Sequence, residues 1–178
     1  IAPTWVDGNL MEVCGGELVE SLLAAGLRVI LRPHRDSIDA DPPWLAAVRT
    51  RFAGDSRFGI SDGQTGGNPV DRADLLVTDW SGAALSFSLG MEKPVLSVDV
   101  PAKVLNADFV RFELPAFEET VRHRIGRVLP PEHAADAGDI AMQLISERRN
   151  YVPVLRELRR ETVFNPGRSA AVGAAILH

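Results

Sequence analysis

Short apolar runs separated by helical patterns most constrain the fold of this chain. Residues 27–32, 75–78 and 94–98 are rich in β-branched and aliphatic side chains, as strands buried on both faces of a parallel sheet are. Residues 57–60 and 109–112 are weaker strand candidates, and residues 1–4 resemble the end of another buried strand. We therefore expect about five or six strands.

Helical periodicity fills the intervals between these runs. Leu18, Val19, Leu22 and Leu23 share one face, and Gly26 follows where helices commonly end. Further helices are expected at residues 43–52, 81–90, 117–128, 140–145 and 154–158, and residues 63–67 form the most loop-like stretch. Alternating strands and helices indicate an α/β fold with a doubly wound, mostly parallel sheet. We predict a single Rossmann-like domain over residues 1–178, helical from about residue 117.

Composition excludes several classes of protein. With 178 residues, of which 46% are hydrophobic, the chain has the composition of a folded domain. The net charge of −5 argues against binding to nucleic acid, since phosphate contacts need a basic surface. The single cysteine, Cys14, excludes an internal disulfide, and we expect no metal site and no cofactor. The chain opens at Ile1 without a methionine, which we interpret as a piece of a longer protein.

Polar residues follow several of the expected strands. In an open α/β sheet, ligands bind beyond the carboxyl ends of the strands. Thr4 ends one strand candidate, and Asp79 and Asp99 each stand just after another. These residues are predicted to lie at the rim of one cleft.

The segment Asp79-Trp80-Ser81-Gly82-Ala83 is the sharpest motif. A strand ends at Asp79, and a helix of small residues begins near Ser81. Free backbone amides at Gly82 and Ala83, with the helix dipole behind them, would suit a phosphate. The alternative is a plain helix cap, in which Ser81 or Asp79 accepts hydrogen bonds from those amides.

The segment Arg32-Pro33-His34-Arg35 is the second motif. Two guanidinium groups and an imidazole at a strand end would clamp an oxyanion, and His34 would protonate a leaving phosphate oxygen. The alternative is a solvated basic turn, with Arg32 paired to Asp36 or Asp39. The functional interpretation requires both motifs to face one cleft.

These motifs resemble a known family. The order of residues 2–5, 31–34, 73–81 and 93–96 (APTW, LRPH, ADLLVTDWS and KPVL) is similar to that in the CDP-glycerol glycerophosphotransferases. That family comprises teichoic-acid primases and polymerases of GT-B architecture. The resemblance covers about residues 1–115, and it implies the C-terminal, donor-binding half of such an enzyme, with the upstream domain outside this chain.

The resemblance also implies roles for individual residues. His34 matches the family's catalytic histidine, which contacts the donor pyrophosphate, and Ser81 matches a serine that contacts phosphate. Three positions depart from the family pattern: Arg35 replaces a second proline, Gly82 replaces a second serine, and Ser86 stands where an acidic residue is common. The donor is therefore open between CDP- and UDP-linked compounds.

The function implied is transfer of glycerol phosphate or a sugar in the synthesis of a cell-surface polymer, in the cytoplasm at the inner face of the membrane. Two alternatives remain: half of a UDP-GlcNAc 2-epimerase of the same architecture, and a non-catalytic flavodoxin-like module. Arginines at 148–149, 156 and 159–160 suggest contact with an acidic membrane surface. Glu147, Glu157 and Glu161 favour instead an ordinary solvated helix face.

Overall fold

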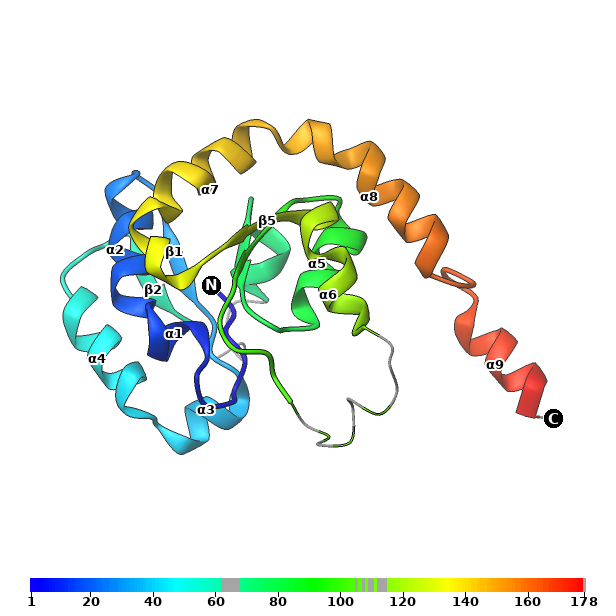
Figure 1. Ribbon diagram of the computed structural model, residues 1–178, viewed down its shortest axis with the longest axis horizontal. Helices are drawn as coiled ribbons and strands as arrows, with labels where there is room; N and C mark the ends of the chain where they lie inside the picture. Colours follow the sequence, from blue (N-terminus) through cyan, green and yellow to red (C-terminus); the bar gives the residue numbers. More distant parts are fainter. Residues whose placement is uncertain (62–67, 105, 107, 109–110, 112–114, 178) are drawn as a thin grey trace.

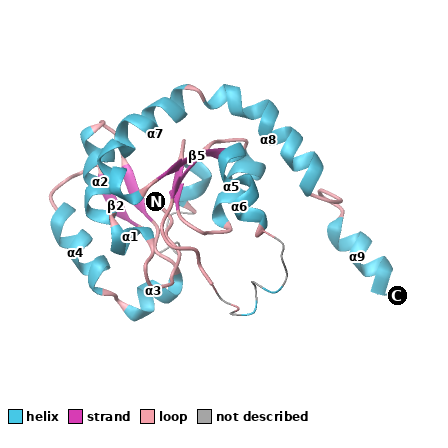
Figure 2. Cartoon of the chain, viewed as in Figure 1, coloured by secondary structure: helices cyan, strands magenta, loops and turns pink. Residues whose placement is uncertain are grey.

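The computed structural model describes residues 1–61, 68–104, 106, 108, 111 and 115–177 (Figure 1). The fold is α/β, with short parallel strands surrounded by helices (Figure 2). Strands β1 (Val29–Leu31) and β2 (Phe58–Ile60) form one parallel pair. Strands β3 (Leu76–Thr78), β4 (Val95–Val98) and β5 (Gly126–Leu129) form a parallel sheet in that order.

The first two residues connect the two sheets. The Ile1 backbone nitrogen donates to the Ile30 carbonyl at 2.8 Å, and the Arg32 amide donates to the Ile1 carbonyl at 2.8 Å. On the other side, the Ala2 amide donates to the Val77 carbonyl at 2.9 Å, in a parallel bridge with Thr78. The segments thus lie in the order β2, β1, residues 1–2, β3, β4, β5, with their carboxyl ends at one edge.

Helices fill the intervals, largely as the periodicity predicts. They are α1 (Leu10–Val13), α2 (Gly15–Ala24), α3 (Arg35–Ala40), α4 (Pro43–Phe52), α5 (Ala83–Met91), α6 (Phe117–Ile125), α7 (Ala137–Ser146), α8 (Arg148–Thr162) and α9 (Ser169–Leu177), with 3₁₀ helices η1 (Pro69–Arg72) and η3 (Pro131–Asp136). Gly26 has the expected left-handed conformation after α2, with φ of 83°. The Gly26 and Leu27 amides bond to the Leu23 and Leu22 carbonyls, which is a Schellman motif.

Two hydrophobic clusters form the core. One contains Leu18, Leu31, Val77, Leu96 and Leu144, and the other contains Leu76, Phe87, Val95, Ile125 and Leu158. Leu76 and Val77 are neighbours in β3 but belong to different clusters, and the same holds for Val95 and Leu96 in β4. Successive residues of a strand point to opposite faces of its sheet. The two clusters therefore lie on opposite faces of the sheet.

The helix predicted over residues 117–128 is wrong at its end. Helix α6 stops at Ile125, and Val128 belongs to strand β5, paired with Ser97 of β4. Gly126 permits this pairing, because a Cβ atom there would lie 1.8 Å from the Val95 carbonyl oxygen. The predicted loop at 63–67 and most of the predicted strand at 109–112 fall outside the described residues.

The C-terminal part consists of α6 to α9, with β5 and η3 among them, and α9 extends away from the body (Figure 1). Several arginines of α8 pair with the body: Arg148 with Asp74 at 3.1 Å, and Arg156 and Arg159 with Glu92 at 2.9 and 3.1 Å. Three of the arginines considered for contact with a membrane surface are thus paired within the protein. Within the described residues, no helix has both the length and the apolar character needed to cross a membrane.

Candidate functional site

Asp79 is buried at the carboxyl end of β3, and the protein itself uses its carboxylate. One oxygen accepts from the Thr4 amide at 2.9 Å, and the other accepts from the Thr4 hydroxyl and the Leu10 amide, both at 3.1 Å. Leu10 is the first residue of α1, so the carboxylate occupies the positive end of that helix. The structure therefore brings Thr4 and Asp79 together as predicted, as an internal pair.

Ser81 begins the turn into α5. Its hydroxyl accepts from the Ala83 amide at 3.3 Å, and its carbonyl accepts from the Ala84 amide at 3.0 Å. This geometry agrees with the helix-cap interpretation of Ser81. Gly82 is exposed and has open space where a Cβ would stand, so the first turn of α5 stays open to a ligand.

His34 lies at the carboxyl end of β1 and caps α3. Its Nδ1 accepts from the Asp36 amide at 3.3 Å and lies 3.5 Å from the Asp36 carboxylate, which leaves Nε2 facing away from both groups. The ring centroid lies 6.3 Å from that of Trp5, and about half of the side chain is exposed. Arg35 faces solvent, 3.9 Å from Asp39. His34 can therefore donate from Nε2 to a ligand beside Trp5.

The two motifs share one edge of the sheet. His34 follows β1 and Ser81 follows β3, and residues 1–2 lie between these parallel strands. Two strand spacings separate them, which is roughly 10 Å. The residues around positions 34 and 81 therefore lie at the same edge of the sheet.

Arg32 points elsewhere. It is half-buried and lines a cavity of about 430 Å³ together with Arg28 and Arg72. Ser81 lines a separate hollow, of about 10 Å³, with Ser97 and Arg122. The structure therefore places two residues of the predicted phosphate set, Arg32 and Ser81, in different cavities.

Asp99 belongs to a network centred on Arg122, which was not among the residues predicted from the sequence. The Arg122 guanidinium bonds to Asp99 at 2.7 Å and to the Val98 carbonyl at 3.0 Å, and lies 4.0 Å from the Trp80 ring centroid. The Trp80 indole donates to the Val100 carbonyl at 2.7 Å. The burial of Arg122 could have been predicted, because Arg122 stands three residues before Ile125, on the apolar face of α6. This network fixes Trp80, the residue before Ser81.

Two buried polar atoms lie beside the start of α5 without a partner among the described residues: Ser97 Oγ and Arg122 Nε. Both residues line the small hollow with Ser81, whose volume suits a single water-sized group. Buried polar atoms normally have hydrogen-bond partners. This hollow is therefore a polar extension of the α5 end of the site.

The remaining candidate chemistry is sparse. Cys14 is buried, and desolvation together with the nearby Glu17 and Asp79 carboxylates raises the pKa of its thiol to about 11. Such a thiol is a poor nucleophile. No group of three or more metal-ligating side chains occurs in the described part of the chain.

Comparison with known proteins adds no relative: no family model matches the sequence, and no curated protein or solved structure matches it.

Proposed function

We propose that this chain is a doubly wound, Rossmann-like domain that binds a nucleotide-diphosphate donor. The segment order β2, β1, residues 1–2, β3, β4, β5 corresponds to 3-2-1-4-5-6 when segments are numbered along the chain, counting residues 1–2 as the first strand. That order is the one found in dinucleotide-binding sheets, where ligands bind at the point at which the order reverses. Here this point lies between residues 1–2 and β3.

The site at this point has two sides and a floor. Thr4 and Asp79 form the floor, the His34 imidazole stands on the β1 side, and the first turn of α5 stands on the β3 side. The single observation that carries the proposal is this placement of His34 and Ser81 at one carboxyl edge, flanking the reversal point. A donor diphosphate would accept from His34 Nε2 and from the Gly82 amide, since the Ala83 and Ala84 amides already donate to Ser81.

The reaction proposed is the one that the family resemblance implies. Glycerol phosphate or a sugar passes from a CDP- or UDP-activated donor to a surface-polymer acceptor, with a partner domain of the same protein supplying the acceptor side. His34 donates a hydrogen bond from Nε2 that stabilises charge building on the leaving diphosphate, aided by the α5 dipole. The proposed setting is the cytoplasm, at the inner face of the membrane.

Calorimetric titration with CDP, UDP and CMP tests this proposal. We expect the diphosphates to bind more tightly than CMP, and His34→Ala and Ser81→Ala each to weaken CDP binding about tenfold. His133→Ala and Ser56→Ala are matched controls, because both residues are exposed and lie outside the site. Absence of CDP binding at millimolar concentration, or equal weakening by the controls, would overturn the proposal.

A further inference from the structure

A cavity of about 430 Å³ lies on a face of the sheet and not at its carboxyl edge. Along β1 and its ends, Arg28, Ile30 and Arg32 alternate with Val29 and Leu31, which are buried in the core. The cavity of about 430 Å³ forms over the first set, and η1 supplies its opposite wall. This volume falls within the range of sites for small molecules.

Three arginines line this cavity without a partner. Among the described residues, Arg28, Arg32 and Arg72 make no side-chain hydrogen bond or ion pair, whereas arginines such as Arg57 and Arg122 are paired. Among the described residues of the cavity wall, the one carboxylate is that of Asp74, which is 3.1 Å from Arg148. In a chain of net charge −5, this is a local concentration of unpaired positive charge.

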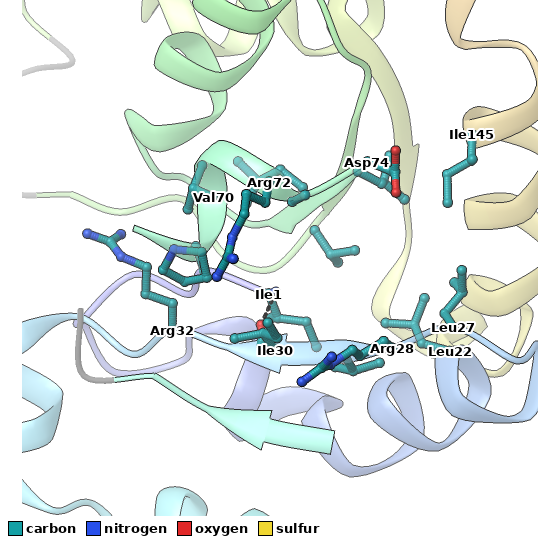
Figure 3. Close-up of a pocket in the computed structure, with 17 residues that line it drawn as sticks. Ile1, Leu22, Leu27, Arg28, Ile30, Arg32, Val70, Arg72, Asp74 and Ile145 are labelled. Atoms are coloured by element: carbon teal, nitrogen blue, oxygen red, sulfur yellow. Dashed lines mark hydrogen bonds between the residues drawn. The ribbon is translucent and has the colours of Figure 1, made fainter. Parts of the chain in front are cut away.

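The cavity is polar at one end and apolar at the other. Figure 3 shows Arg72 reaching from η1 toward β1, with Arg32 at the same end. At the opposite end lie Leu22, Leu27 and Ile145, with the Asp74 carboxylate beside Ile145 and paired with Arg148. A ligand that fills this space therefore needs an anionic group and an apolar body.

We propose that this cavity binds a soluble phosphomonoester with an apolar body. The phosphate lies between Arg32 and Arg72, whose planar guanidinium groups match its oxygens, and Arg28 adds a third positive charge. The apolar body lies against Leu22, Leu27 and Ile145. This site is separate from the proposed donor site, so its existence does not depend on the proposed function.

Titration of the whole chain with hexyl phosphate and methyl phosphate, followed by calorimetry, tests the site. We expect hexyl phosphate to bind at least tenfold more tightly than methyl phosphate, because only its chain reaches the apolar end. Arg72→Gln and Arg32→Gln should each weaken hexyl phosphate about tenfold. Arg149→Gln is the matched control, since Arg149 is exposed on α8 and has no partner among the described residues.

Three results would overturn this proposal: equal affinity for the two phosphates, equal weakening by Arg149→Gln, or a loss after Ser81→Ala as large as that after Arg72→Gln. The last result would place the phosphate in the donor site. Circular dichroism confirms that each variant is folded before titration. Failure of CDP to bind leaves the hexyl phosphate result intact, so the two proposals fail independently.

Discussion

The carboxyl edge of the sheet and the cavity on its face use their polar groups in opposite ways. At the edge, Thr4, Asp79 and Ser81 all bond to other parts of the chain. On the face, Arg28 and Arg72 have no partner among the described residues. The edge groups are largely buried and must be satisfied internally, whereas exposed guanidinium groups remain solvated until a ligand arrives. A polar residue at a strand end is therefore not by itself a free binding group.

Replacing Asp79 should have the largest effect. Asp79→Ala leaves the Thr4 amide, the Thr4 hydroxyl and the Leu10 amide without their acceptor in a buried position. We expect a loss of about 3–5 kcal/mol in the free energy of unfolding, measured by urea titration with circular dichroism. Asp71→Ala, at an exposed position, is the control. A loss below about 1 kcal/mol would show that the edge groups are not structural.

Replacing Arg122 should have the next largest effect. Arg122→Met removes the bonds to Asp99 and Val98 and the stacking on Trp80, with a cost of about 2 kcal/mol in the free energy of unfolding. Tryptophan fluorescence should also change, because Trp80 loses its cover. Arg124→Met, in the same helix, removes only an exposed pair with Glu161 and should cost much less. Equal costs for the two variants would contradict this account.

Acid pH should weaken the attachment of α8 by a smaller amount. Hydrogen bonds and charge from Arg156, with the nearby Arg159, hold the pKa of Glu92 below its ordinary value of 4.5. The stabilisation is therefore complete above pH 4.5 and is lost as pH falls through the lowered folded-state pKa. Urea midpoints should fall less steeply in Glu92→Gln than in the parent chain over this acid range. Parallel slopes would show that the pair contributes nothing.

Replacing the cavity arginines should have the smallest effect on stability. The double variant Arg28→Gln, Arg72→Gln removes two exposed charges that have no partner among the described residues, so the free energy of unfolding should stay within about 0.5 kcal/mol. Urea titration measures this. A loss above about 1 kcal/mol in the free energy of unfolding would show that these arginines support the fold. The cavity arginines would then not differ from the polar groups at the carboxyl edge.

Much of the secondary structure was predictable from local patterns. The strands at residues 76–78 and 95–98, and the helix ended by Gly26, follow from apolar runs, periodicity and a left-handed glycine. Strand β5 was not predictable in this way. Val128 continues the 3.6-residue spacing of Phe117, Val121 and Ile125, so the sequence fits a helix as well as a strand there. Only pairing with β4, and the fit of Gly126 against Val95, selects the strand.

The sequence predicted where in the fold the candidate site lies, but not which residues form it. Parallel strands require His34 and Ser81 to share one edge, and the sequence supports that inference. The register then decides where each side chain points, and it turns Arg32 onto the face of the sheet. Arg122 was missed because its partners, Asp99 and Trp80, lie on other elements.

The sequence by itself determined the alternation of strands and helices, because backbone preferences and apolar periodicity act over a few neighbouring residues. Only the tertiary structure decided which polar groups form hydrogen bonds or ion pairs within the protein. The partner that occupies Asp79 is Thr4, 75 positions away along the chain, and the arginines of the cavity share a wall only because β1 and η1 face each other. Hydrogen bonding and charge pairing depend on distance in space, which local sequence patterns do not encode.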